Sequence, residues 1–133
     1  MKLEHLIICR DSIIDREKNT VSVFEIIEGL VVKAGVKVVT LPFHLLIVFR
    51  RESEIGEKDF SYDLVVMNPI GKEIVKIHLP TRIEAQHRRS RLRVNGTFSI
   101  DSSGDYIFRV LNQDEVMGEA LLGVNFECIE GAR

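Results

Sequence analysis

Residues 89–101 of the chain read RSRLRVNGTFSID, and the order of polar and apolar side chains along them indicates the fold class. Leu92, Val94, Phe98 and Ile100 share one parity, whereas arginines and small polar residues occupy the other. Successive side chains of a β-strand point to opposite faces of a sheet. The stretch therefore predicts a strand with one buried face and one solvated face.

The dipeptide Asn95-Gly96 inside this stretch is a strong signal for a two-residue hairpin. The alternation nevertheless continues without a break from Leu92 to Ile100. We therefore expect one continuous strand with a bulge at Asn95-Gly96. A similar alternation of Tyr106, Phe108 and Val110 predicts that the next strand contributes to the same core.

Clusters of Gly, Asn, Asp and Ser separate further strand-like segments along the chain. Polar residues 11–19 are expected to connect the first two strands as a hairpin, and Pro42 is expected to open an apolar strand covered on both sides. The segment 29–40 is ambiguous between a loop and a short strand. The remaining expected strands cover residues 2–10, 20–28, 43–50, 60–67, 72–79, 105–111 and 117–126.

Eight or nine strands and no segment with helical periodicity indicate an all-β protein. We expect residues 1–133 to form a single antiparallel β-sandwich, either immunoglobulin-like or jelly-roll-like, with its terminal strands near one another. A closed β-barrel is the alternative.

The composition limits the classes of partner. The chain of 133 residues has 18 basic and 20 acidic side chains and a formal net charge of −2, which excludes a globally basic nucleic-acid binder but allows a local basic patch. No apolar run approaches the roughly 18 residues of a membrane span. The apolar stretch at the N-terminus is too short for an export signal. We therefore expect a cytoplasmic protein in which Cys9 and Cys128 are buried thiols rather than a disulfide.

Arginines provide the only concentrated chemistry in the sequence. Arg88, Arg89, Arg91 and Arg93 are the candidate binding residues, and Arg82 and His87 lie close to them in sequence. Because neighbouring like charges repel, acidic groups should lie opposite. These groups could be carboxylates of the same chain such as Glu73 or Asp63, the surface of a protein partner or second copy, or the phosphates of a ligand.

Other site chemistry is not apparent from the sequence. There is no nucleophile elbow, phosphate-binding glycine loop or dinucleotide fingerprint, so we predict no cofactor and no catalytic residues. His5, His44, His78 and His87 lack metal-ligand spacing and are expected at the surface or at the rim of the sheets. Glu52, Glu54, Glu57 and Asp59 are expected to form a solvated loop.

Four segments together resemble a family of small uncharacterised prokaryotic proteins. They are ICRDS at 8–12, NTVSVFEIIE at 19–28, LPF at 41–43 and GDYIFRV at 104–110. The resemblance implies a β-sandwich of unknown function and supplies no catalytic residue.

Three functions are compatible with these observations. We favour a non-catalytic module that binds a protein partner, or a second copy of itself, through its sheet surfaces. The alternative is binding of a polyanion or nucleic acid through the basic strand at Arg88–Arg93; nucleic acid is disfavoured because no aromatic side chains interleave with the arginines for base stacking. An enzyme whose site is assembled from distant strands is the third possibility.

Overall fold

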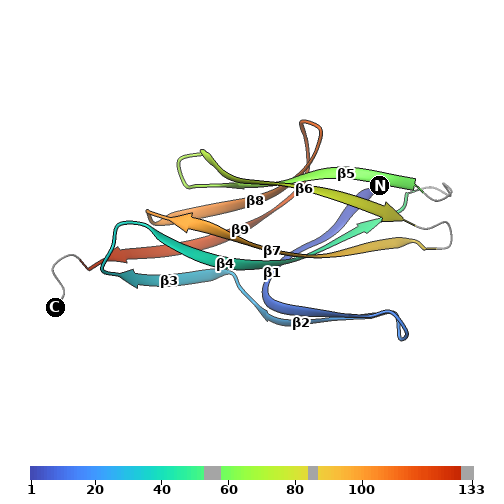
Figure 1. Cartoon of the computed structure of the whole chain (residues 1–133), viewed down its shortest axis with the longest axis horizontal. Helices are drawn as coiled ribbons and strands as arrows, with labels where there is room; N and C mark the ends of the chain where they lie inside the picture. Colours follow the sequence, from blue (N-terminus) through green and yellow to red (C-terminus); the bar gives the residue numbers. More distant parts are fainter. Residues whose placement is uncertain (53–57, 84–86, 130–133) are drawn as a thin grey trace.

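The computed structural model describes residues 1–52, 58–83 and 87–129, which form nine strands (Figure 1). No helix in this part of the chain is long and apolar enough to cross a membrane. The strands are β1 (Lys2–Asp15), β2 (Thr20–Ile26), β3 (Gly29–Ala34), β4 (Val39–Arg50), β5 (Lys58–Met67), β6 (Glu73–Ile83), β7 (Arg89–Ile100), β8 (Gly104–Asn112) and β9 (Glu115–Cys128).

The strands form two sheets, with the orders β2-β1-β4-β7 and β3-β9-β8-β5-β6. Apolar side chains from both sheets make one core between them, which confirms the predicted sandwich. The described strands join as two separate sheets with open edges rather than as a closed barrel. One pair differs from the fully antiparallel expectation, because β3 runs parallel to β9. The terminal strands β1 and β9 lie in different sheets and meet where Leu3 packs against Gly118.

The alternating residues of β7 and β8 form the centre of the core, as predicted. Ile100, Tyr106, Phe108 and Val110 are fully buried, and the rings of Phe98 and Phe108 pack edge to face at 5.5 Å. Such pairs add to the apolar burial that stabilises the sandwich.

Strand β4 is the strand covered on both faces. Every residue from Phe43 to Phe49 is buried, as the sequence indicates for all of them except His44. The strand begins at Val39, however, so the prediction that Pro42 opens it is wrong. The β1–β4 pairing ends at Cys9 and His44, so at Pro42 strand β4 has only β7 as a neighbour, and a residue without an N–H is tolerated there.

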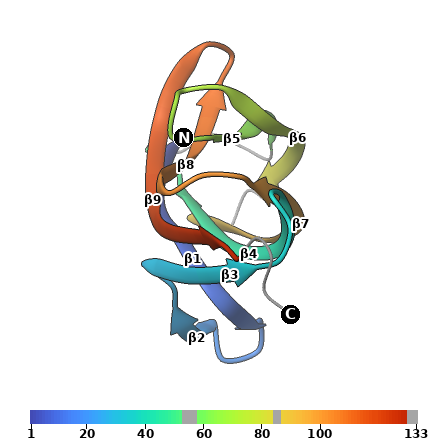
Figure 2. The same cartoon turned by 90° about the vertical axis from the view of Figure 1, so that its left-hand side faces the viewer.

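Strand β1 changes partner along its length. Residues 2–9 pair with β4, and residues 9–15 pair with β2. The predicted connection at 11–19 is therefore wrong in its first part, because only residues 16–19 form the turn of the expected hairpin. The hairpin extends from the body of the sandwich at the bottom of Figures 1 and 2. Its residue Ser12 reaches His44 on the outer face of β4.

Strand β7 is continuous through Asn95-Gly96, and its register with β4 has no shift. The predicted continuity is confirmed and the predicted bulge is wrong. A Cβ atom at Gly96 would lie 2.5 Å from the Phe43 ring, so this position needs glycine for packing rather than for a turn.

Candidate anion-binding cleft

A cleft of about 580 Å³ lies between strands β6 and β7 and is bordered by the tip of the β1–β2 hairpin. Its cationic and titratable lining residues are Arg16, Arg82, His87, Arg88, Arg89 and Arg91. None of the described residues that line it carries a carboxylate. We refer to this feature as the arginine cleft.

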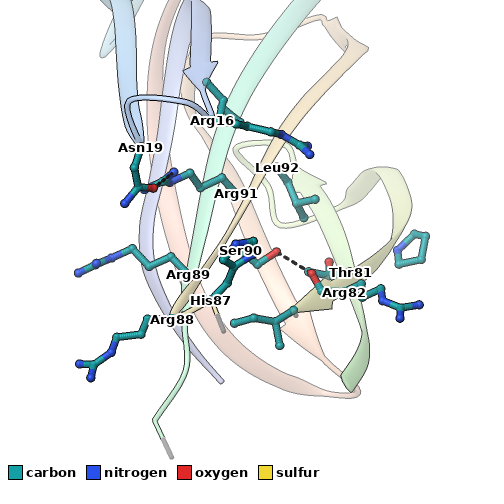
Figure 3. A pocket seen from close by; sticks show the side chains of 13 residues that line it. Arg16, Asn19, Thr81, Arg82, His87, Arg88, Arg89, Ser90, Arg91 and Leu92 are labelled. Carbon is teal, nitrogen blue, oxygen red and sulfur yellow. Dashed lines mark hydrogen bonds between the residues drawn. The ribbon is translucent and has the colours of Figure 1, made fainter. Parts of the chain in front are cut away.

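Two consecutive segments line the arginine cleft, residues 80–83 of β6 and residues 87–92 at the start of β7. Because successive side chains alternate between the faces of a strand, a cleft touched by consecutive residues must run along the strand edges. Both strands are the last of their sheets. Figure 3 shows Arg88, Arg89 and Arg91 extending to one side of β7, whereas Arg16 and Arg82 point to the other.

Arg89 is paired within the chain. Its Nε donates to Glu4 Oε1 at 2.7 Å, and Arg50, which lies directly opposite it on β4, is 3.7 Å from Glu4 Oε2. The hydrogen bond from Arg89 holds the pKa of Glu4 below its ordinary value, and the same bond raises the pKa of Arg89. One carboxylate therefore serves two guanidinium groups, which leaves an excess of positive charge at this end of the strand.

Arg93 is also paired, at the other end of the arginine row. Its NH2 atom donates to Asp11 Oδ1 at 3.0 Å, and its Nε donates to Ser12 Oγ at 3.3 Å. The pKa of Asp11 is lowered, first by the hydrogen bond from the backbone N–H of Ser12 and then by Arg93. Arg93 does not line the arginine cleft.

Three other arginine side chains that line the cleft have no charged partner among the described residues. Arg91 donates to the neutral amide oxygen of Asn19 at 2.8 Å. Arg88 and Arg16 are exposed and form no ion pair with the described residues. The four predicted binding residues thus divide into two with carboxylate partners, Arg89 and Arg93, and two without, Arg88 and Arg91.

The acidic partners of the row are not those suggested by the sequence. Asp63 lies in the other sheet and pairs with His78 at 3.0 Å, and Glu73 lies at the start of β6. The carboxylates that reach the arginines, Glu4 and Asp11, both come from β1. Loop residues Glu54 and Glu57 lie outside the described residues, as do the side-chain surroundings of Asp59.

The prediction that His44 lies at the surface or at the rim of the sheets is wrong. His44 is buried, and its Nε2 lies 2.7 Å from Ser12 Oγ while its Nδ1 lies 2.8 Å from Asn95 Oδ1. We call Asp11, Ser12, His44, Arg93 and Asn95 the histidine network. The neighbours of His44 along β4 are apolar, so the sequence gave no sign that His44 would have polar partners from other strands.

The Ser12–His44–Asn95 arrangement has the order of a nucleophile, base and orienting group. Ser12 is fully buried, however, and its hydroxyl also accepts from Arg93. A substrate could not approach this oxygen in the described conformation. The network instead satisfies buried polar groups and fastens the β1–β2 hairpin to β4 and β7.

Both cysteines are free thiols. Cys9 is buried as predicted, and burial raises its pKa, whereas Cys128 is only half-buried. Within the described residues, no group of three or more His, Cys, Asp or Glu side chains could hold a metal ion.

No family model and no curated protein matches the chain. Among solved structures, it is similar to an immunoglobulin-like protein from Pseudomonas aeruginosa, with 9% sequence identity and a TM-score of 0.37 over 92% of this chain and 98% of that one. The assignment of a nine-stranded sandwich follows from the topology of this chain itself.

Proposed function

We propose that the protein is a non-catalytic binding module that holds an acidic segment of a protein partner in the arginine cleft. The observation that carries this proposal is a cleft whose described lining includes five arginines and one histidine and no carboxylate. Arginine is enriched at protein interfaces and forms bidentate bonds with carboxylates. An acidic partner would supply the charge that Arg16, Arg88 and Arg91 do not find in the described part of this chain.

The remaining lining supports a protein partner over a nucleic acid. Ile14, Pro80, Ile83 and Leu92 give the cleft an apolar component, and no Phe, Tyr or Trp is among the described residues that line it. Single-stranded nucleic acids are usually held by stacking on aromatic rings. A polyanion such as nucleic acid is the second candidate, favoured only by the charge, and it is an outcome of the test below.

The test is fluorescence anisotropy with a labelled peptide of alternating Glu and Thr, compared with a labelled single-stranded oligonucleotide. We expect the peptide to bind more tightly and its affinity to fall as salt rises, because exposed charges are screened. Reversing charge in Arg88→Glu/Arg91→Glu should lower the peptide affinity at least about tenfold.

The matched control is Arg10→Glu/Lys33→Glu, which changes the net charge by the same amount at residues outside the cleft. Arg10 pairs with Glu25 on the hairpin, and Lys33 pairs with Glu127 at the far edge of the other sheet. An equal loss in both double variants would mean that net charge alone drives binding. Tighter binding of the oligonucleotide would favour the polyanion candidate instead.

We also propose that the chain belongs to the family of small prokaryotic β-sandwich proteins that its sequence resembles. The two-sheet architecture is compatible with this assignment. The family contributes no activity, so the functional proposal depends on the arginine cleft alone.

A further inference from the structure

The backbone of β7 has a free edge toward the cleft. In the described part of the chain this strand pairs with β4 alone. The backbone N–H of Arg51 donates to the carbonyl of Arg88 at 2.8 Å, in line with the β4–β7 register, so the peptide groups of even-numbered residues point toward β4. Hydrogen-bonding direction alternates along an antiparallel strand. The N–H and C=O groups of Arg89, Arg91 and Arg93 therefore point to the free edge.

The same three residues carry the arginine side chains of the outer face. A strand that paired with this edge would place every second residue directly beside an arginine, at a Cβ separation of about 4.5–5.5 Å. Acidic side chains beside Arg89 and Arg91 would each meet a guanidinium group of the cleft, whereas Arg93 is already bonded to Asp11 and Ser12. The free backbone groups and the arginine side chains of β7 thus both recur at every second residue. A partner strand that matches one therefore also matches the other.

We propose that the acidic partner binds by strand addition: an extended segment with acidic residues at alternate positions pairs with the free edge of β7. This inference rests on the proposed function and specifies how the partner is recognised. Strand addition to an open sheet edge is a common mode of peptide recognition, in which the main chain gives affinity and alternate side chains give specificity.

The first test compares two peptides of equal composition and charge, ETETETET and EEEETTTT. Strand addition predicts that the alternating peptide binds about tenfold more tightly, because only it can place each carboxylate on the arginine side of the new strand. Methylation of every second backbone nitrogen of the alternating peptide gives two variants. The variant methylated at the N–H groups that face β7 should not bind, whereas the variant methylated at the other positions should still bind.

The second test is amide hydrogen exchange of the protein with and without the alternating peptide. The amides of Arg89 and Arg91 should become protected on binding, whereas those of Ser90 and Leu92, which already point toward β4, should change little. Equal affinity of both peptides without new protection would overturn strand addition but leave an acidic partner in place. If neither peptide binds, both proposals fail.

Discussion

The two ends of the arginine row, residues 88–93, differ in the partners that their guanidinium groups have within the chain. At the histidine network, Arg93 meets a carboxylate and a hydroxyl that β1 brings across the sheet. At the arginine cleft, Arg89 is bonded to Glu4, but among the described residues Arg91 meets only a neutral amide and Arg88 meets no carboxylate. At the first end, a carboxylate of the same chain neutralises the arginine. At the second end, carboxylates of a binding partner could do so.

This difference separates arginines that stabilise the fold from arginines that are candidates for binding a partner. Buried polar groups are costly unless each is hydrogen-bonded, which explains why His44 has a partner on both ring nitrogens. An exposed arginine without a partner costs little, because water solvates it. We therefore expect substitutions in the histidine network to act on folding and substitutions in the arginine cleft to act on binding.

The largest expected effect is on stability, in Ser12→Ala. Removing the hydroxyl leaves the buried Nε2 of His44 without its partner, which should lower the free energy of unfolding by about 1–3 kcal/mol. Urea denaturation measures this change. The matched control is Ser99→Ala on the exposed face of β7, where we expect less than about 0.5 kcal/mol. Equal stability of the two variants would contradict a structural role for the network.

A smaller effect, on affinity, is expected for Glu4→Gln. Loss of this carboxylate releases Arg89 and Arg50 and makes the cleft more positive, so the alternating acidic peptide should bind roughly two- to fivefold more tightly. The control is Glu25→Gln, which removes the same charge from the ion pair with Arg10. If both variants gain equally, Arg89 is not part of the binding surface and the division between the two ends is drawn in the wrong place.

The alternation of polar and apolar residues predicted those strands in which the pattern of neighbouring residues determines which side chains are buried. The parities of β7 and β8 identified the central core from Phe98 to Val110, because a period of two is a property of neighbouring residues. Residues 11–15 were missed as a strand because Asp11, Ser12 and Asp15 give this short segment the composition of a turn. Their structure depends on distant partners, since the buried Ser12 is hydrogen-bonded to His44 and Arg93.

The candidate site was predicted only in part for the same reason. The arginines are visible in the sequence, but their partners depend on sheet register. Glu4 lies 85 residues from Arg89 in the chain and reaches it through the pairing of β1 with β4 and of β4 with β7. Arg16 joins the cleft only because the hairpin places its turn there.

The smallest expected effect concerns acid sensitivity at the two carboxylate-paired arginines. The pKa values of Glu4 and Asp11 are lowered in the folded protein, so their ionised forms favour folding. This contribution is fully present above their unfolded pKa values, near 4, and is lost as the pH falls through the lower folded values. The urea midpoint of Glu4→Gln/Asp11→Asn should thus lie slightly below that of the wild type at pH 7, and the gap should narrow toward pH 3. A gap that stays constant would mean that these ion pairs do not couple protonation to folding, and that Arg89 and Arg93 are no more committed to the fold than Arg88 and Arg91.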